Sequence, residues 1–139
     1  MRRRDAAIFT ALTDAFCEPR DPFPQVSDTD AVAFMGELLA ASPAVNRLGF
    51  RVLLRVLETA PLARGYRGRF LRLSGSERRE FLHGLDRSRF LLARIAARLL
   101  KTLTIMCYWG DPRVLAAAGY DADANIARAH ALRQREGRP

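Results

Sequence analysis

Apolar residues recur at every third or fourth position along most of the chain, and this helical period restricts the possible folds more than any other feature. No window shows the sustained alternation of apolar and polar residues that a half-buried strand requires. The sequence therefore predicts an all-α protein. Because 139 residues is the size of one ordinary domain, we expect a single-domain irregular helical bundle of about five to six helices.

Prolines, glycines and capping residues divide this pattern into segments. The predicted helices cover about residues 5–17, 28–42, 43–61, 74–86, 88–108 and 112–119. Ser74 and Glu77 have the spacing of a capping box. The other predicted caps are Ser27 or Asp28, Ser42 before Pro43, Asp86 or Ser88, and Asp111 before Pro112. Residues 62–73 are expected to form a loop that ends in a partly buried Phe70-Leu71 contact.

Each of the longer predicted helices carries an apolar stripe that should face the core. The stripes consist of Ile8, Phe9, Leu12, Ala15 and Phe16 in the first helix, Ala31, Phe34, Met35, Leu38 and Leu39 in the second, and Val45, Leu48, Val52, Leu53, Val56 and Leu57 in the third. The helix that ends near Tyr108 is expected to be the longest and to lie at the centre. Its apolar residues cover more than one narrow face, so we expect packing on two or more sides by Leu91, Leu92, Ile95, Ala96, Leu99, Leu103 and Met106.

The last part of the chain differs from the rest in composition. Residues 121–139 alternate alanines with polar groups, and Ile126 and Leu132 are their only large apolar side chains. A helix of this composition is marginal in isolation. We therefore divide the chain into a helical domain, residues 1–120, and a polar C-terminal tail, residues 121–139.

The charge of the chain is concentrated in its middle. The formal net charge is +8, and residues 51–110 hold 12 Arg and Lys101 against 4 acidic residues. A basic surface can attract nucleic acid, anionic membranes or acidic proteins. This stretch shows neither stacking aromatics nor a base-reading helix clearly, so we expect no nucleic-acid partner. A basic helical nucleic-acid-binding or regulatory module remains the alternative interpretation.

The two cysteines and the first residues bear on the cellular compartment. Cys17 and Cys107 are compatible with one disulfide or with two buried free thiols. The apolar stretch after Arg2–Arg4 is short and is interrupted by acidic residues, so it does not predict a cleavable signal peptide. The most apolar window, residues 90–109, contains three basic residues and is a poor candidate for a membrane span. These features predict a soluble, cytoplasmic protein without a transmembrane segment.

Groups that could perform chemistry are scarce. His83 and His130 lack the spacing of a metal or nucleophile motif and are expected on the surface. The Gly65–Gly68 segment lacks the pattern of a phosphate-binding loop. Asp14 is the best isolated carboxylate, but such a residue is more often exposed or paired with arginine than a general base. We therefore expect no catalytic, cofactor-binding or metal-binding residues, although a small independent enzyme remains a further alternative.

Three aromatic residues with polar atoms lie near predicted helix ends. Tyr108 and Trp109 precede the Gly-Asp-Pro turn, and Tyr120 follows Gly119. Such residues are favoured at protein interfaces, although the residues alone favour the simpler interpretation that they close one end of the core. The sequence alone leaves both interpretations open.

The same segment carries a family resemblance. The run from Lys101 through Tyr108–Pro112 to Gly119-Tyr120, with Leu73–Leu82 and Leu12–Asp14 before it, resembles the gluconate 2-dehydrogenase subunit 3 family. These proteins are small helical accessory subunits, and the pattern also resembles the helical N-terminal extension of some long-chain alcohol oxidases. The chain departs from the family at Leu115 and Ala118 and in lacking a twin-arginine signal.

The resemblance implies a non-catalytic subunit that binds and stabilises, or helps to fold, a separately encoded FAD-dependent oxidoreductase of the glucose-methanol-choline class. It implies a hetero-oligomer in which this chain holds no cofactor and the partner holds FAD. A periplasmic location would follow only if another subunit exported the complex. The resemblance assigns six residues of this chain to the family's structural motif and to a partner interface: Tyr108, Trp109, Asp111, Pro112, Gly119 and Tyr120.

Overall fold

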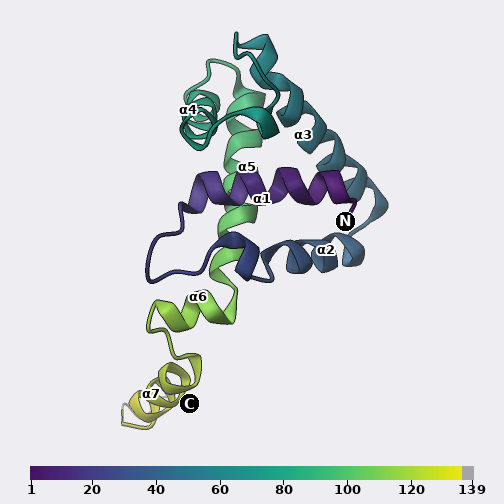
Figure 1. Ribbon diagram of the computed structural model, residues 1–139. Coiled ribbons are helices and arrows are strands. Elements are labelled where there is room, and N and C mark those ends of the chain that lie inside the picture. Colours follow the sequence, from purple (N-terminus) through teal and green to yellow (C-terminus); the bar gives the residue numbers. More distant parts are fainter. Residues whose placement is uncertain (136–139) are drawn as a thin grey trace.

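The computed structural model describes residues 1–135, which contain seven α-helices, two short 3-10 helices and no strand (Figure 1). The α-helices are α1 Arg3–Cys17, α2 Ala31–Ala41, α3 Ala44–Ala63, α4 Gly75–Asp86, α5 Leu91–Trp109, α6 Pro112–Ala117 and α7 Ala122–Arg135. The 3-10 helices are η1 Val26–Asp28 and η2 Phe70–Arg72. The all-α prediction is confirmed.

Helix α5 is the centre of the arrangement. It packs against α1, α2, α4 and α6, and α1 crosses it (Figure 1). Its central position was predicted correctly. The prediction that it is the longest helix is wrong, because α3 has 20 residues and α5 has 19.

The main core lies where α1, α3, α4 and α5 meet. Ile8, Phe9 and Leu12 of α1 are completely buried, as their spacing predicts. Phe70 of η2 and Phe81 of α4 join them, with ring centroids 6.1 Å apart. The predicted Phe70-Leu71 contact is thus present, and it forms part of a 3-10 turn that closes the core.

Several helix ends follow the predicted signals. The Ser74 hydroxyl accepts the Glu77 N–H at 3.3 Å, and the Glu77 carboxylate accepts the Ser74 N–H at 2.8 Å, which completes the capping box. Helix α6 begins at Pro112 after its cap Asp111. Gly119 follows α6 with a φ of 68°, a left-handed conformation that glycine adopts without strain.

Other boundaries were predicted incorrectly. Helix α2 begins at Ala31 instead of residue 28, because the 3-10 turn η1 first brings Val26 into a buried position. Helix α3 begins after Pro43 and continues past Pro61 to Ala63. Helix α5 begins at Leu91. The predicted cap Ser88 instead accepts the Phe90 N–H at 3.2 Å in the turn before the helix.

Two buried carboxylates hold α3 against α1 and η2. Asp5 forms an ion pair with Arg55 at 3.0 Å, and Glu58 forms one with Arg4 at 3.3 Å. Glu58 also accepts the Leu71 N–H at 3.2 Å. A buried carboxylate that loses its arginine partner leaves an uncompensated charge, which is strongly destabilising. The two ion pairs therefore hold α3 in place against α1.

The C-terminal helix lies apart from the core. Helix α7 extends beyond α6 at the end of the molecule (Figure 1). Its side chains from residue 124 to residue 135 are all exposed. The predicted tail is therefore helical over these residues without joining the core, and its last residues, 136–139, lie outside the described part of the chain.

Candidate functional site

Tyr108, the first of the six motif residues chosen from the resemblance, is a core residue in this structure. Its side chain is 1% exposed, and its hydroxyl donates a hydrogen bond to the Pro24 carbonyl oxygen at 2.7 Å. With Val26 and Val114 it forms a second, smaller buried cluster. Tyr108 therefore fastens the loop between α1 and α2 to the end of α5.

Asp111 also has a structural role. It is 4% exposed, and its Oδ1 accepts the Arg113 N–H at 2.8 Å, which caps α6. Its Oδ2 accepts the Asp30 N–H at 2.6 Å at the start of α2. One carboxylate thus connects two helix N-termini that are 81 residues apart in the sequence.

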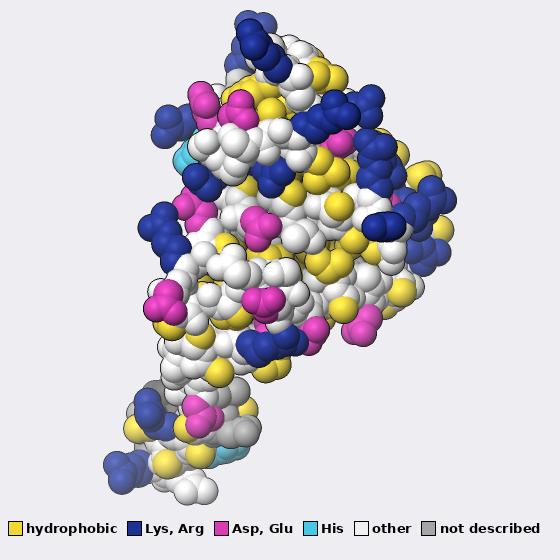
Figure 2. Space-filling view, in the orientation of Figure 1, with side chains coloured by type: hydrophobic (Ala, Val, Ile, Leu, Met, Phe, Trp, Pro, Cys, Tyr) yellow, Lys and Arg dark blue, Asp and Glu magenta, His cyan; other side chains and the backbone are white. Residues whose placement is uncertain are grey.

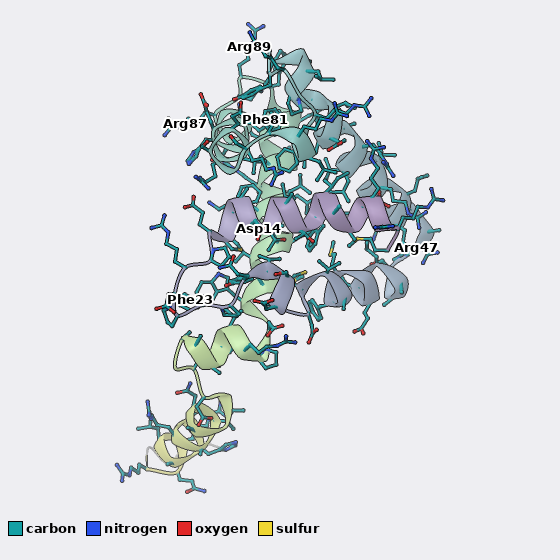
Figure 3. The ribbon with its side chains drawn as sticks, in the orientation of Figure 1. Asp14, Phe23, Arg47, Phe81, Arg87 and Arg89 are labelled. Atoms are coloured by element: carbon teal, nitrogen blue, oxygen red, sulfur yellow. The ribbon has the colours of Figure 1, made fainter. Side chains whose placement is uncertain are left out.

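The other four motif residues lie at the surface. Trp109 is 40% exposed and packs edge-on against Phe23, with ring centroids 5.2 Å apart. Figure 3 shows Phe23 on the loop beside α6. Tyr120 is 53% exposed, and Pro112 and Gly119 are exposed as well. A partner can reach these four residues, whereas the side chains of Tyr108 and Asp111 face the interior; their contact with a partner stays a prediction.

The two cysteines are free thiols near the same end of α5. Cys107 is buried, with its Sγ 3.9 Å from the Met35 Sδ, and Cys17 is partly buried. Burial raises the pKa of each thiol to about 11. A thiol with so high a pKa is a poor nucleophile near neutral pH. Of the two alternatives left by the sequence, the structure has two free thiols, of which only Cys107 is fully buried.

Asp14 lies partly buried on α1, one turn before Cys17, and is labelled in Figure 3. Partial burial raises the pKa of its carboxyl group, and the charge of Arg78 offsets only part of this rise. Among the described residues no group of three His, Cys, Asp or Glu side chains could hold a metal ion. His83 and His130 are exposed, as predicted.

The arginines of residues 64–79 do not all serve as a free basic surface. Arg78 donates to the carbonyl oxygens of Phe70 and Leu71 at 3.1 and 2.9 Å. Arg64 lies over the Phe81 ring, and Arg79 forms an ion pair with Glu18 at 3.3 Å. On the face that Figure 2 shows, Lys and Arg side chains gather most densely along the edge formed by α3 and the start of α1, and Asp and Glu side chains lie among basic ones over the rest of the face. Arg67, Arg69 and Arg72 are exposed, and the nucleic-acid interpretation stays an untested alternative.

A large exposed apolar surface replaces much of the packing predicted for α2, α3 and α5. The exposed side chains that line one continuous apolar groove are Leu38 of α2, Val45, Val52 and Val56 of α3, and Leu92, Ile95 and Leu99 of α5. Phe34 of α2, Leu48 of α3, and Leu91 and Met106 of α5 are exposed as well. Leu92 is 80% exposed. Helix α5 is thus packed by several helices, as predicted, but the predicted burial of Leu91, Leu92, Ile95, Leu99 and Met106 is wrong.

The physical reason lies in which face of α5 meets α1. That face presents Ala97, Leu100, Thr104 and Cys107, and all four are buried. The larger aliphatic residues lie on another face, and no described element of the chain covers them. The helical period predicted an apolar stripe correctly but could not show what packs against it.

Comparison of the chain with known protein families, curated proteins and solved structures finds no match. No helix in the described part of the chain has the length and apolar character needed to cross a membrane. The exposed apolar surface and the motif at the end of α5 are therefore the features from which a function can be argued.

Proposed function

We propose that the chain is a non-catalytic small subunit that binds and stabilises a separately encoded FAD-dependent oxidoreductase of the glucose-methanol-choline class, acting on alcohols or sugars. The observation that carries the proposal is the exposed apolar surface of α2, α3 and α5. Soluble monomers rarely expose apolar patches of more than a few hundred square ångströms, and larger patches mark interaction sites. A subunit that functions in a complex has a reason to keep such a surface.

The identity of the partner rests on the resemblance of residues 101–120 to the small-subunit family. Under this proposal the redox chemistry belongs to FAD in the large subunit, and this chain contributes binding and stability. Its α5–α6 turn, held by Asp111 and Tyr108, would present the exposed Trp109 to the partner.

Coexpression tests the proposal. The chain is produced with a glucose-methanol-choline flavoprotein encoded in the same operon, and the flavoprotein alone serves as control. We expect a complex that survives gel filtration and a flavoprotein that is less soluble without the small subunit. The proposal fails if the two proteins migrate separately and the flavoprotein is fully soluble and active alone.

A second measurement tests whether the redox chemistry belongs to the partner and not to this chain. The purified chain alone should show no flavin absorbance, no stoichiometric metal and no dehydrogenase activity, since the proposal places FAD in the partner. Flavin bound to the isolated chain would contradict it.

A further inference from the structure

An open hollow lies between the start of α1 and the adjacent side of α3. Its volume is about 540 Å³. Basic and aliphatic side chains share its lining, which consists of Arg2, Asp5, Leu48, Arg51, Val52, Arg55, Val56 and Thr59. The apolar groove between α3 and α5 has no charged residue in its lining. The hollow therefore differs from the groove in combining positive charge with exposed aliphatic surface.

The sequence of α3 explains this combination. Two rows of side chains run next to each other along the helix, each with one residue at every fourth position: Arg47, Arg51 and Arg55 in one row, and Leu48, Val52 and Val56 in the other. Residues four positions apart lie on the same side of an α-helix. The three aliphatic side chains are between 54% and 61% exposed. Helix α3 thus presents a basic row beside an aliphatic row to the outside of the molecule.

The start of α1 adds positive charge to the same face. The two ion pairs described above hold α1 beside α3, and their carboxylates are buried. Arg2, Arg3 and Arg51 are exposed, and none of the three forms an ion pair with a carboxylate in the described part of the chain. Figure 2 shows basic side chains gathered most densely along this edge. The face therefore keeps a positive charge that its own carboxylates do not balance.

We propose that this face of α1 and α3 binds the surface of an anionic lipid bilayer. Arg2, Arg51 and Arg55 contact the lipid phosphates, and Leu48 enters the boundary between the headgroups and the acyl chains. Helices that carry basic side chains beside aliphatic ones bind bilayers in this orientation. Clustered arginines on such a helix are attracted by the negative surface potential of anionic lipids.

This inference does not depend on the proposed function. Val52 and Val56 line both the hollow and the apolar groove. Leu48 and the arginines of the hollow do not line the groove, so the tests below use them. The bilayer is thus assigned to the side of α3 that faces away from α5.

Other anionic partners match the face less completely. The phosphates of a nucleic acid fit the arginines, but a nucleic acid has no aliphatic part to cover the second row. An acidic protein segment needs carboxylates and aliphatic side chains at matching positions, whereas every anionic phospholipid carries both chemical groups. The two rows lie on a helix at the outer edge of the molecule (Figure 1). A planar surface can therefore contact both rows along about 14 Å of α3.

The first test is cosedimentation of the full chain with vesicles. Vesicles of phosphatidylcholine and phosphatidylglycerol are compared with vesicles of phosphatidylcholine alone. We expect binding to the anionic vesicles, binding about tenfold weaker or worse to the neutral ones, and a decrease as the salt concentration rises. Equal binding to both kinds of vesicle, or no binding to the anionic vesicles at low salt, overturns the inference.

The second test examines the two rows separately with Arg51→Gln and Leu48→Gln. We expect each variant to bind anionic vesicles about fivefold more weakly, because one loses an arginine near the charged surface and the other loses a half-exposed aliphatic side chain. The matched controls on α7 are Arg133→Gln and Ile126→Gln, which should stay within about twofold. Circular dichroism verifies that the variants remain helical. If Leu48→Gln binds like the unchanged chain, or if Arg133→Gln loses as much as Arg51→Gln, the inference is overturned.

The third test measures insertion and the competing anions. Leu48→Cys labelled with a nitrobenzoxadiazole fluorophore should shift to the blue on anionic vesicles and be quenched by nitroxides on the acyl chains, whereas labelled Ile126→Cys should not change. A DNA duplex or a polyglutamate peptide that binds through Arg51 as tightly as the vesicles overturns the inference, as does displacement of the chain from vesicles by inorganic phosphate at constant ionic strength.

The outcomes separate this inference from the proposed function. A flavoprotein complex that forms while anionic vesicles stay unbound overturns the inference and leaves the accessory role standing. Vesicle binding that depends on Leu48 and Arg51, without any flavoprotein complex, supports the inference and overturns the accessory role.

Discussion

The inner and outer faces of α5 have similar sequence patterns and very different surroundings. On the inner face, Leu100 is 1% exposed and packs in the core with α1. On the outer face, its neighbour Leu99 is 49% exposed and lines the groove. Both leucines belong to apolar stripes with helical spacing. The comparison shows that an apolar stripe predicts a helix with an apolar face. Whether that face is buried depends on which other part of the chain, or which partner, packs against it.

The largest expected difference comes from truncating these two neighbours. Leu100→Ala should lower the free energy of unfolding by about 2–5 kcal/mol, because it removes a buried side chain and leaves a cavity. Leu99→Ala should lower it by less than about 1 kcal/mol. Urea unfolding of the isolated chain measures both values. Equal losses would mean that the outer face of α5 is as well packed as the inner face.

A smaller effect is expected at the cap that joins α2 and α6. Asp111→Ala should lower the free energy of unfolding by about 1–3 kcal/mol, because it leaves the N–H groups of Asp30 and Arg113 without their acceptor. Asp121 accepts the Ala124 N–H at the start of the exposed α7. Asp121→Ala should therefore have little effect on global unfolding. If the two variants lose the same stability, Asp111 does not have the structural role assigned to it.

Tyr108 and Tyr120 give a comparison within the motif. Tyr108→Phe removes one hydrogen bond, to the Pro24 carbonyl oxygen, and should cost about 0.5–1.5 kcal/mol. Tyr120→Phe should cost nothing measurable in the isolated chain, because the side chain is exposed. Thermal unfolding of both variants is the measurement, and a loss at Tyr120 alone would reverse the assignment of inner and outer motif residues.

The smallest effect is expected at Asp14 and depends on pH. Partial burial raises the pKa of its carboxyl group above the ordinary value of 3.8. The charged form is thus less stable in the folded than in the unfolded state, so the carboxylate lowers stability at neutral pH. Asp14→Asn should therefore stabilise the chain slightly at pH 7, and the gain should disappear as the pH falls below the pKa of the folded state. A destabilised variant at pH 7 would show that Asp14 is held by a favourable charge interaction instead.

Local signals in the sequence were sufficient for the helices and several caps. Ser74, Glu77 and Asp111 act on groups within three residues of themselves, so their role can be predicted from spacing. The Tyr108 hydroxyl and the second oxygen of Asp111 bind groups more than 80 residues away. Spacing contains no information about such contacts, and for this reason the sequence could not separate the buried motif residues from the exposed Trp109 and Tyr120.

The groove was missed for the same reason. Val52 and Ile95 were interpreted as core residues because apolar side chains at helical spacing usually are. Their exposure results from the position of α3, which is set by ion pairs of Asp5 and Glu58 with arginines 50 or more residues away. The one sign of this surface in the sequence is that the apolar residues of α5 cover more than one narrow face.

Chemical footprinting of the flavoprotein complex tests most directly whether a partner covers the outer face of α3 and α5. Ile95→Cys and, as control, Ile126→Cys are each treated with a maleimide at pH 7, where the native thiols react slowly because their pKa is about 11. We expect Ile95→Cys to react readily in the free subunit and about tenfold or more slowly in the complex, and Ile126→Cys to react equally in both. An intact complex in which Ile95→Cys reacts as fast as in the free subunit would contradict the account.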